Sequence, residues 1–400
     1  MLDMYRISTK DLDANTTKHL TGGAIKAAPT DFNLYLILDA SSWQRAKKTI
    51  PFIKRNINPK KIVIVSSSKI AGEDLLGCVF LDEDRIVQNL SFGSVKRHIE
   101  KLGGDTKNTG WYLQQFIKLG ISLVCEEEFY LVWDSDTIPL NHIDFFDTDG
   151  RPFFNLKREY FHSYFQTIER LFGIKKSTKE SFISEHMIFK ADIVREMLSK
   201  IEANEKIDGR NFYQKILAAS DLLHMDFIKT DQRFFSEFET FGTYCDAFHP
   251  KVYAKRRLRT LRHGTDFLGF DPTDEVLEWA AHDFDTISFE SWGTPIAETV
   301  ALSKDERKRR EMSFANTIRQ FFKNERKRIF EEFPKINHER FRHFFESTIA
   351  KTNFDFFFSK KLAYSKRNPY FEDSILQSFH FLYVTKCRIH RYWRLFTFRF

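Results

Sequence analysis

Residues 34–65 read LYLILDASSWQRAKKTIPFIKRNINPKKIVIV, and this pattern predicts a strand, a helix and a second strand in succession. The apolar runs 34–38 and 61–65 are short and uninterrupted, as in strands that are buried on both faces. Serines at the start of the intervening segment can cap a helix over about 42–56. Two strands joined by a helix make a βαβ unit, so we expect a parallel sheet with helices on its faces.

The composition excludes several classes of protein. The chain has 400 residues, of which 42% are hydrophobic and 29% charged, so it can bury the core of one large α/β domain or of two to three ordinary ones. No run approaches the roughly 18 apolar residues of a membrane-spanning helix, and residues 1–23 lack the apolar centre of a secretory signal. The four cysteines form no CxxC pair, which argues against a disulfide framework or a structural zinc site and fits a reducing cytoplasm.

Positive charge is concentrated in the last quarter of the chain. Residues 301–400 hold 23 lysines and arginines against 11 acids, whereas residues 1–300 are net negative. Arginines are interleaved with aromatic rings over 386–400, and the 44 phenylalanines of the chain cluster at sites such as 354–358. Three interpretations stay open: a solvated helical face over a Phe-rich core, an anionic membrane surface, or nucleic-acid phosphates. Because no nucleic-acid module is recognisable, we expect no nucleic-acid partner.

The remaining chain predicts helices and strands up to about residue 250 and helices alone beyond residue 300. The expected helices cover 94–102, 110–120, 159–171, 191–203, 211–220 and 236–246, and the expected strands cover 129–133 and 181–189. Asp149-Gly150, between two Phe-rich segments, predicts a hairpin turn. Residues 1–30 are polar and predict a flexible lead-in.

Two aspartates, Asp134 and Asp136, directly follow the expected strand 129–133. Carboxylates at the carboxyl end of a parallel strand lie in the crevice where open α/β sheets bind ligands. The pair suits a cation, with one carboxylate on the metal and one on a bound water or a ribose hydroxyl. An ordinary turn, in which aspartate accepts hydrogen bonds from backbone N–H groups, explains the same pattern. A haloacid-dehalogenase phosphatase with Asp134 as nucleophile is a third possibility, although Ile138 stands where that motif needs Thr or Val.

Five segments follow one another in a recognisable order. They are 110–119 (GWYLQQFIKL), 133–137 (WDSDT), 149–152 (DGRP), 185–189 (EHMIF) and 236–242 (SEFETFG). Their order and spacing resemble a family of bacterial glycosyltransferase-like proteins with a GT-A type nucleotide-sugar-binding domain. The resemblance implies a Rossmann-like, mixed α/β sheet flanked by helices over residues 31–265. A helical, Phe-rich, basic region would follow over 266–400.

The resemblance also implies which residues bind the donor. Asp134 and Asp136 match the family's D-x-D, which implies that they bind Mn²⁺ or Mg²⁺ and the donor diphosphate. The other donor-binding candidates match the G-W-Y-x-Q-Q stretch or end the first strand, and they are Gly110, Trp111, Gln114, Gln115 and Asp39. Core packing is the alternative for Trp111. His249 is a candidate to complete the metal shell, with His263 as its alternative.

Four further side chains are candidates for acid–base chemistry: Glu185, His186, Glu237 and Glu239. An inverting transfer needs a carboxylate that takes the proton of the acceptor hydroxyl. On a helix Glu237 and Glu239 point about 200° apart, so we favour Glu237 and expect Glu239 to face solvent. A satisfied core histidine is the alternative for His186. The basic residues of 255–262 either balance the leaving diphosphate or form a solvated loop.

Together these features predict a metal-dependent glycosyltransferase that moves a sugar from a nucleotide-sugar donor to a surface glycan, such as lipopolysaccharide or capsule. We expect a cytoplasmic protein whose residues 301–400 contact the inner membrane, where a lipid-linked glycan acceptor lies. The alternatives are the phosphatase and a non-enzymatic protein that binds anionic polymers or membranes through its basic C-terminal region.

Overall fold

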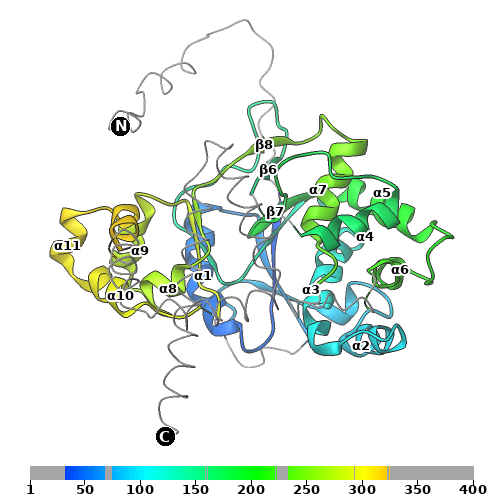
Figure 1. Ribbon diagram of the computed structural model, residues 1–400, viewed down its shortest axis with the longest axis horizontal. Helices are drawn as coiled ribbons and strands as arrows, with labels where there is room; N and C mark the ends of the chain where they lie inside the picture. The colour runs from blue at the N-terminus through cyan, green and yellow to red at the C-terminus, as the bar shows by residue number, and fades with distance from the viewer. Residues whose placement is uncertain are drawn as a thin grey trace, which may run out of the picture.

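A five-stranded mixed sheet forms the centre of the molecule (Figure 1). The computed structural model describes residues 32–324 except 68–73, 158, 160, 221, 223–232, 292 and 322–323. The strand order is β3-β2-β1-β4-β7, and these strands are Val79–Asp82, Lys61–Ser66, Asn33–Ile37, Phe129–Trp133 and His186–Lys190. β7 runs antiparallel to β4, and the other neighbours are parallel. The predicted α/β fold with a mixed sheet flanked by helices is confirmed.

The two middle strands, β1 and β4, consist of residues that suit burial on both faces. All five residues of each strand are buried. Tyr130 of β4 stacks on Phe189 of β7, with ring centroids 5.1 Å apart. Apolar surface removed from water stabilises the fold by about 25 cal/mol per Å², so these strands are held mainly by burial. Burial therefore fixes the ends of β1 and β4, and with them the positions of the residues that directly follow.

Helices cover both faces of this sheet. In Figure 1, α2 to α7 lie to the right of the sheet, and α1 and α8 to α11 lie to the left. The helices up to α7 are α1 Trp43–Asn56, α2 Phe92–Lys101, α3 Thr109–Gly120, α4 His162–Phe172, α5 Ala191–Glu202, α6 Phe212–Ala219 and α7 Glu237–Phe248. Each predicted helix lies within three residues of one of these at both ends. Side-chain caps explain some of the boundaries: Ser236 Oγ accepts a hydrogen bond from the Glu239 amide at the start of α7.

A three-stranded sheet continues from the end of β4. β5 (Thr137–Pro139) pairs antiparallel with β10 (Thr286–Ser288), which pairs in parallel with β9 (Thr260–Leu261). A second apolar core lies under this sheet, where Ile138 and Leu277 are buried together. The helices around that core are α8 Gly264–Leu268, α9 Asp274–Ala281, α10 Ala297–Lys304 and α11 Glu306–Glu311. Chain beyond residue 265 thus completes a sheet that begins next to Asp136.

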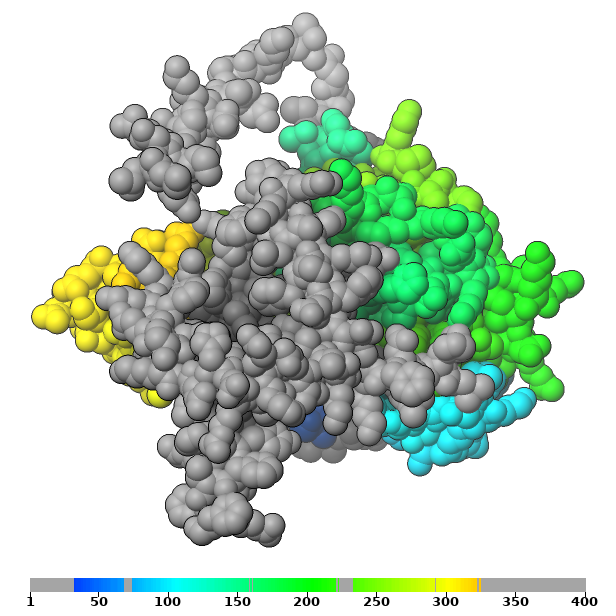
Figure 2. Space-filling model, in the orientation of Figure 1, coloured from blue at the N-terminus to red at the C-terminus, as the bar shows by residue number. Residues whose placement is uncertain are grey.

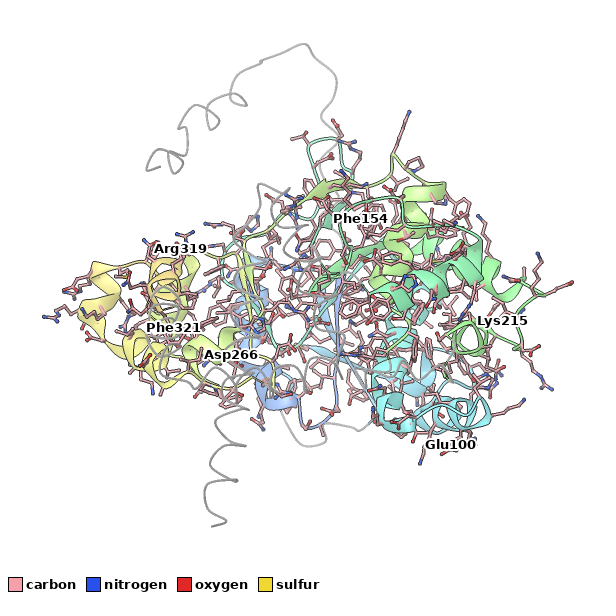
Figure 3. All side chains as sticks on the ribbon, viewed as in Figure 1. Glu100, Phe154, Lys215, Asp266, Arg319 and Phe321 are labelled. Carbon is pink, nitrogen blue, oxygen red and sulfur yellow. The ribbon has the colours of Figure 1, made fainter. Side chains whose placement is uncertain are left out.

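The left-hand end of the molecule is made by this later part of the chain. Figure 2 shows α10 and α11 as the yellow edge of the surface, and Figure 3 places Asp266 and Phe321 on the same side. Glu100 and Lys215 lie at the opposite, right-hand end in Figure 3. The division into units at 31–265 and 266–400 stays a prediction.

The predicted strand 181–189 is a strand only from His186 onward. Ser181 instead makes an isolated bridge with Lys157, and its hydroxyl donates to a carboxylate oxygen of Glu239 at 2.5 Å. Side-chain bonding of this kind replaces the regular ladder, so the strand begins five residues later than predicted.

The predicted turn at Asp149-Gly150 is confirmed. Gly150 has a φ of 76°, a left-handed conformation that favours glycine, and its amide donates to the Asp147 carbonyl at 3.0 Å. The hairpin itself is only an isolated bridge between Phe146 and Pro152. The next strand, β6 (Phe153–Asn155), pairs in parallel with β8 (Ala254–Arg256).

Residues 1–30 and 325–400 lie outside the described residues, so the flexible lead-in and the basic, Phe-rich region stay predictions. Among the residues that are described, no helix is both long enough and apolar enough to cross a membrane.

Gly242, in the middle of α7, tests how closely this helix packs. A Cβ at this position would lie 2.1 Å from a ring carbon of Phe182, which is closer than real Cβ contacts allow. We expect Gly242→Ala to destabilise the protein by about 1–3 kcal/mol in urea denaturation, because the ring or the helix must move. Gly110→Ala in α3 is the control: its nearest neighbour would be a ring carbon of Phe92 at 3.9 Å. The control should be neutral or stabilise by up to about 1 kcal/mol, and equal effects would contradict the close packing.

Candidate active site

The carboxyl ends of β1 and β4, here called the crevice, lie where the chain changes its direction across the sheet. From β1 the chain continues to β2 and β3 on one side, whereas β4 lies on the other side. Ligands of open α/β sheets bind at such a topological switch point. Asp39 follows β1 and Asp134 follows β4, so two predicted donor-binding residues lie beside this crevice.

Three separate segments hold the turn that carries Asp134 and Asp136. The Asp134 amide donates to the Glu185 carbonyl at 2.9 Å, and the Phe289 amide donates to the Asp136 carbonyl at 2.8 Å. The Thr49 hydroxyl of α1 donates to the carbonyl of Ser135 at 2.9 Å. Among the described residues, no backbone N–H donates to either carboxylate. Residues 134–137 nevertheless form a hydrogen-bonded turn, in which the Thr137 amide donates to the Asp134 carbonyl at 3.0 Å, so an ordinary turn stays open as the explanation of these two aspartates.

Lys118 of α3 joins Asp134 to Glu237. Its ammonium lies 3.1 Å from Asp134 Oδ1 and 2.9 Å from Glu237 Oε1, and it stands 4.5 Å from the centre of the Phe238 ring. The lysine and glutamate side chains are almost fully buried, whereas 34% of the Asp134 side chain is exposed. Burial by itself would lower the pKa of Lys118, but the two carboxylates outweigh it and raise this pKa above its usual range. Lys118 is therefore a permanently charged partner of the predicted metal ligand.

Asp136 is a buried carboxyl group with charges of both signs around it. Burial raises the pKa of Asp136 to about 7, and the carboxylates of Asp134 and Glu290 add to this shift. The guanidinium groups of Arg45 and Arg262 act in the opposite direction. A buried carboxyl group with a raised pKa is not fully compensated by its neighbours, and a bound cation would favour its charged form.

The G-W-Y-x-Q-Q stretch lies along one end of the crevice, at the start of α3. Gln114 donates to the carbonyl of Ile37, the last residue of β1, at 3.2 Å. Gln115 is buried with its amide against the carboxylate of Glu237. Trp111 is partly buried and stands edge-on to the Tyr112 ring, with centroids 4.9 Å apart. Gly110 opens the same helix, one turn before Gln114.

Asp39 ends the first strand on the other side of the crevice. Its carboxylate accepts hydrogen bonds from the Ser41 hydroxyl and the Ser42 amide, both at 2.8 Å. It thus stabilises the start of α1 from an exposed position. Its predicted role in donor binding stays a prediction.

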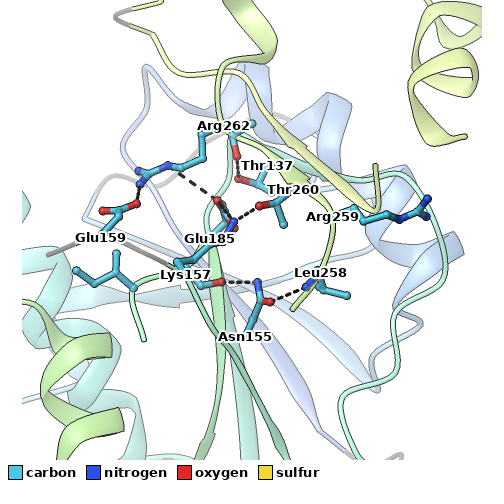
Figure 4. A network of polar contacts seen from close by, with 12 residues as sticks. Thr137, Asn155, Lys157, Glu159, Glu185, Leu258, Arg259, Thr260 and Arg262 are labelled. Atoms are coloured by element: carbon cyan, nitrogen blue, oxygen red, sulfur yellow. Dashed lines mark hydrogen bonds and ion pairs between the residues drawn. The ribbon is translucent and has the colours of Figure 1, made fainter. Parts of the chain in front are cut away.

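Glu185 lies in the network of charged and polar side chains that Figure 4 shows. The carboxylate of Glu185 lies 3.0 Å from Lys157 Nζ and 3.9 Å from Arg262 Nε. Burial alone would raise the pKa of Glu185, but these two cations lower it to about 2. Arg262 also pairs with Glu159 and, at 3.2 Å, with Glu290. Lys157 and Arg262 both contact Oε1 of Glu185, whereas Oε2 is buried without a hydrogen-bond partner among the described residues. The backbone carbonyl of Glu185 holds the Asp134 amide, and the catalytic role of its side chain stays a prediction.

The structure separates Glu239 from Glu237, as their helical positions predict, but Glu239 does not face solvent. It is buried, accepts hydrogen bonds from Ser181 and the Phe182 amide, and lies 3.5 Å from Lys176. The expectation of a solvated Glu239 is therefore wrong, because α7 is covered on both of these faces. Glu237, the favoured base, is instead buried beneath Lys118.

His186 is also not brought to the crevice. Its ring stacks on Trp133 with centroids 4.7 Å apart, and its two ring nitrogens are buried without a hydrogen-bond partner among the described residues. Burial lowers its pKa to about 3, so the ring is neutral at ordinary pH. This position is that of a packed core residue and gives no access to a substrate.

His249 lies at the far end of α7 from Glu237. Twelve residues of helix place it roughly 18 Å away along the helix axis. There it pairs with Glu196, with 3.1 Å between Nε2 and Oε2. The structure therefore corrects its assignment to the metal shell of Asp134 and Asp136. The alternative, His263, pairs with Asp266 at 3.4 Å.

The basic residues of 255–262 are largely used in internal pairs. Lys255 pairs with Asp246 at 2.5 Å, Arg257 with Glu180, and Arg259 with Asp285 at 2.6 Å. Arg256 lies over the rings of Phe145 and Phe153. Arg262 is the member of this group whose charge acts on Asp136.

Sequence reasoning missed Lys118, Arg45 and Glu290. A signal for Lys118 was present, because it lies three residues after Gln115 and four after Gln114, on the same face of α3. Arg45 and Glu290 had no comparable signal, since each is far in sequence from Asp136 and reaches it only through the fold.

The sequence matches the model of one protein family. Residues 27–243 match the family of unknown function DUF6492, which is more than half of the chain. The chain belongs to this family. The match ends within α7 and includes Lys118, both aspartates and Glu237. No curated protein matches this DUF6492 member.

Solved structures similar to this DUF6492 protein are glycosyltransferases. Mouse xyloside xylosyltransferase 1 has 13% identity and a TM-score of 0.36, covering 67% of this chain and 100% of its own. The galactosyltransferase LgtC, with donor and acceptor sugar analogues, has 9% identity and a TM-score of 0.32, covering 64% and 87%. Apo GlyE of Streptococcus pneumoniae has 11% identity and a TM-score of 0.29, covering 74% and 64%. At these scores the similarities carry no assignment of activity.

The neutral, buried state of His186 predicts how stability depends on pH. Its folded pKa of about 3 lies below the ordinary value of 6.5, so the unfolded chain binds the proton more readily. The stability contribution is complete above about pH 6.5 and is lost as pH falls toward 3, at up to about 1.4 kcal/mol per pH unit.

Asp136 acts in the opposite direction over this range, because its pKa is raised to about 7 in the folded state, so the effect of His186 should appear as a difference between wild type and a variant. Relative to wild type, His186→Phe should gain free energy of unfolding in urea denaturation as pH falls from 6.5 to 5, above the range where Glu185 titrates. His142→Phe is the control, since the His142 side chain is 69% exposed. The same pH dependence in wild type and His186→Phe would show that another group is responsible.

Proposed function

We propose that this DUF6492 protein is a glycosyltransferase that uses a nucleotide-sugar donor and Mn²⁺ or Mg²⁺. The observation that supports this most is the position of Asp134 and Asp136, on a rigid turn beside the switch point of the sheet. Nucleotides bind at such points, and a carboxylate pair there suits the cation that accompanies a diphosphate. The motifs that resemble GT-A glycosyltransferase-like proteins support the same conclusion independently of the solved structures.

The residues present fit a divalent cation of this kind. Asp134 keeps Oδ2 without a partner among the described residues, and burial raises the pKa of Asp136, which a bound cation would lower. No group of three His, Cys, Asp or Glu side chains in the described part of the chain could hold a metal by itself. Mg²⁺ commonly takes one or two carboxylates, with substrate phosphates and water completing its shell. When bound, the cation would supply positive charge that stabilises the leaving diphosphate.

The other residues of the crevice would bind and orient the donor. Gln114 and Asp39 flank the end of β1, where the nucleotide would lie. Arg45 and Arg262 place two positive charges near Asp136, and such charges can balance a diphosphate in a site of low dielectric. Glu237 is not proposed as the general base, because it is buried and bound to Lys118.

The acceptor and the location of the protein are parts of the same proposal. We propose a surface-glycan acceptor, lipid-linked at the inner membrane, and a cytoplasmic protein that contacts this membrane through residues 301–400. The supporting observation is the charge of this segment, with 23 lysines and arginines against 11 acids. No observation made on the structure favours the haloacid-dehalogenase alternative.

Donor binding can be tested by thermal shift with UDP-, GDP-, CMP- and ADP-sugars, with and without Mn²⁺. A ligand at 100 times its Kd stabilises the folded state by about 2.7 kcal/mol, so we expect one nucleotide class to raise Tm by several degrees when Mn²⁺ is present. Asp134→Asn and Asp136→Asn should abolish this shift. Asp149→Asn is the control, since its side chain is 74% exposed and outside the site.

A shift of Tm that persists in both site variants would contradict the proposal. Hydrolysis of a phosphate ester by the wild type, lost in Asp134→Asn and needing no nucleotide sugar, would favour the phosphatase instead.

Membrane contact can be tested by sedimentation with vesicles of neutral lipid or of neutral plus anionic lipid. We expect the full chain to bind the anionic vesicles only, and binding to weaken with salt. Deletion of residues 380–400 should reduce binding at least about tenfold, since roughly 1 kcal/mol is lost for each basic residue removed from the surface. Unchanged binding of the shortened chain would contradict the membrane proposal.

A further inference from the structure

Glu237, Lys118 and Asp134 form a chain of charges that runs from the core to the crevice. Successive members are 2.9 Å and 3.1 Å apart, and they come from α7, α3 and the turn after β4. The exposed fraction of the side chains rises along this chain, from 2% for Glu237 through 5% for Lys118 to 34% for Asp134. The only member that a ligand in the crevice can reach freely is thus Asp134.

The ammonium of Lys118 is confined by its surroundings. A buried lysine needs partners for its charge, and here Asp134, Glu237 and the face of the Phe238 ring surround it. It cannot extend to water as an exposed lysine does, since its side chain is covered. Its charge therefore stays beside Asp134 whether or not a ligand is present.

Glu237 is confined in the same way. Its carboxylate meets Lys118 on one side and the Gln115 amide on another. A general base must come within hydrogen-bond reach of the acceptor hydroxyl, and a side chain that is 2% exposed beneath Lys118 does not. What Glu237 does instead is to hold Lys118 and offset part of its charge.

We propose that Lys118 is a resident cation of the proposed donor site and that Glu237 and Lys118 are positioning residues that set the orientation and the effective charge of Asp134. The role rests on the glycosyl-transfer function proposed above. Lys118 occupies Oδ1 of Asp134 and leaves Oδ2 for a divalent cation. The ammonium and the incoming metal compete for the Asp134 carboxylate. Because Glu237 also attracts the ammonium, it weakens the attraction between Lys118 and Asp134.

Two changes to this chain of charges should shift metal affinity in opposite directions. Lys118→Met/Glu237→Gln removes the ammonium and its buried counter-ion together, so Asp134 faces no competing cation and Mn²⁺ should bind at least about tenfold more tightly. Glu237→Gln alone leaves Lys118 with Asp134 as its one carboxylate, so Mn²⁺ should bind about tenfold more weakly. A purely structural role for these residues would not produce opposite signs.

The measurement is an electron paramagnetic resonance titration of free Mn²⁺, without any donor, on the full chain. Lys176→Met/Glu239→Gln is the control: it removes another Lys–Glu pair, 3.5 Å apart, in which Glu239 is buried on a different face of α7 and Lys176 is partly buried. Circular dichroism verifies that each variant is folded. Opposite shifts with an unchanged control support the proposal, and shifts of the same sign, or none, overturn it. If the double variant does not fold, Glu237→Gln alone decides by its weaker binding.

A second measurement separates this role from the proposed function. If the wild type binds no Mn²⁺, the metal dependence proposed above fails, but the link between Lys118 and Asp134 remains testable. We then expect a double-mutant cycle of Lys118→Met and Asp134→Asn, measured by urea denaturation in Glu237→Gln, to show at least tenfold coupling in the unfolding constant. Additive effects would mean that Lys118 does not act on Asp134.

Discussion

The buried ammonium of Lys118 joins three elements, of which α7 is distant in sequence from the other two. A charge in a low-dielectric interior is tolerated only when it is paired, and the partners of Lys118 are Glu237 at the start of α7 and Asp134 after β4. Displacing α3, α7 or the end of β4 would therefore leave at least one charge uncompensated. The positions of these elements are coupled by that requirement, and the crevice at the switch point takes its shape from them.

Asp134 is fixed through both its backbone and its side chain, whereas Asp136 is fixed through its backbone. The amide of Asp134 donates to the Glu185 carbonyl, and its carboxylate meets Lys118. Asp136 is anchored through its carbonyl to the Phe289 amide, while burial, with the carboxylates of Asp134 and Glu290, raises the pKa of its side chain to about 7. A turn whose backbone is held in this way is pre-organised for a cation, because little reorganisation is needed when the cation binds.

Local patterns were enough to predict most of the regular structure before the tertiary contacts were known. The buried runs that became β1, β2 and β4, and the helices that follow amphipathic patterns, depend on burial and periodicity within a few residues. β5 and β9 have three and two residues, too few for a period to show, and they exist because β10 pairs with both. The carboxylates after β4 were likewise predictable, since a strand end and two aspartates are local features.

The sequence by itself determined that the chain is an α/β protein with a parallel βαβ unit and with two carboxylates at a strand end. The tertiary structure alone decided which charged side chains meet there. It buried Glu237 against Lys118, turned Glu239 toward Ser181, and left His249 at the far end of α7. The reason is physical: helical and strand periods act over a few residues, whereas the pairing of buried charges depends on elements that only the tertiary fold brings together.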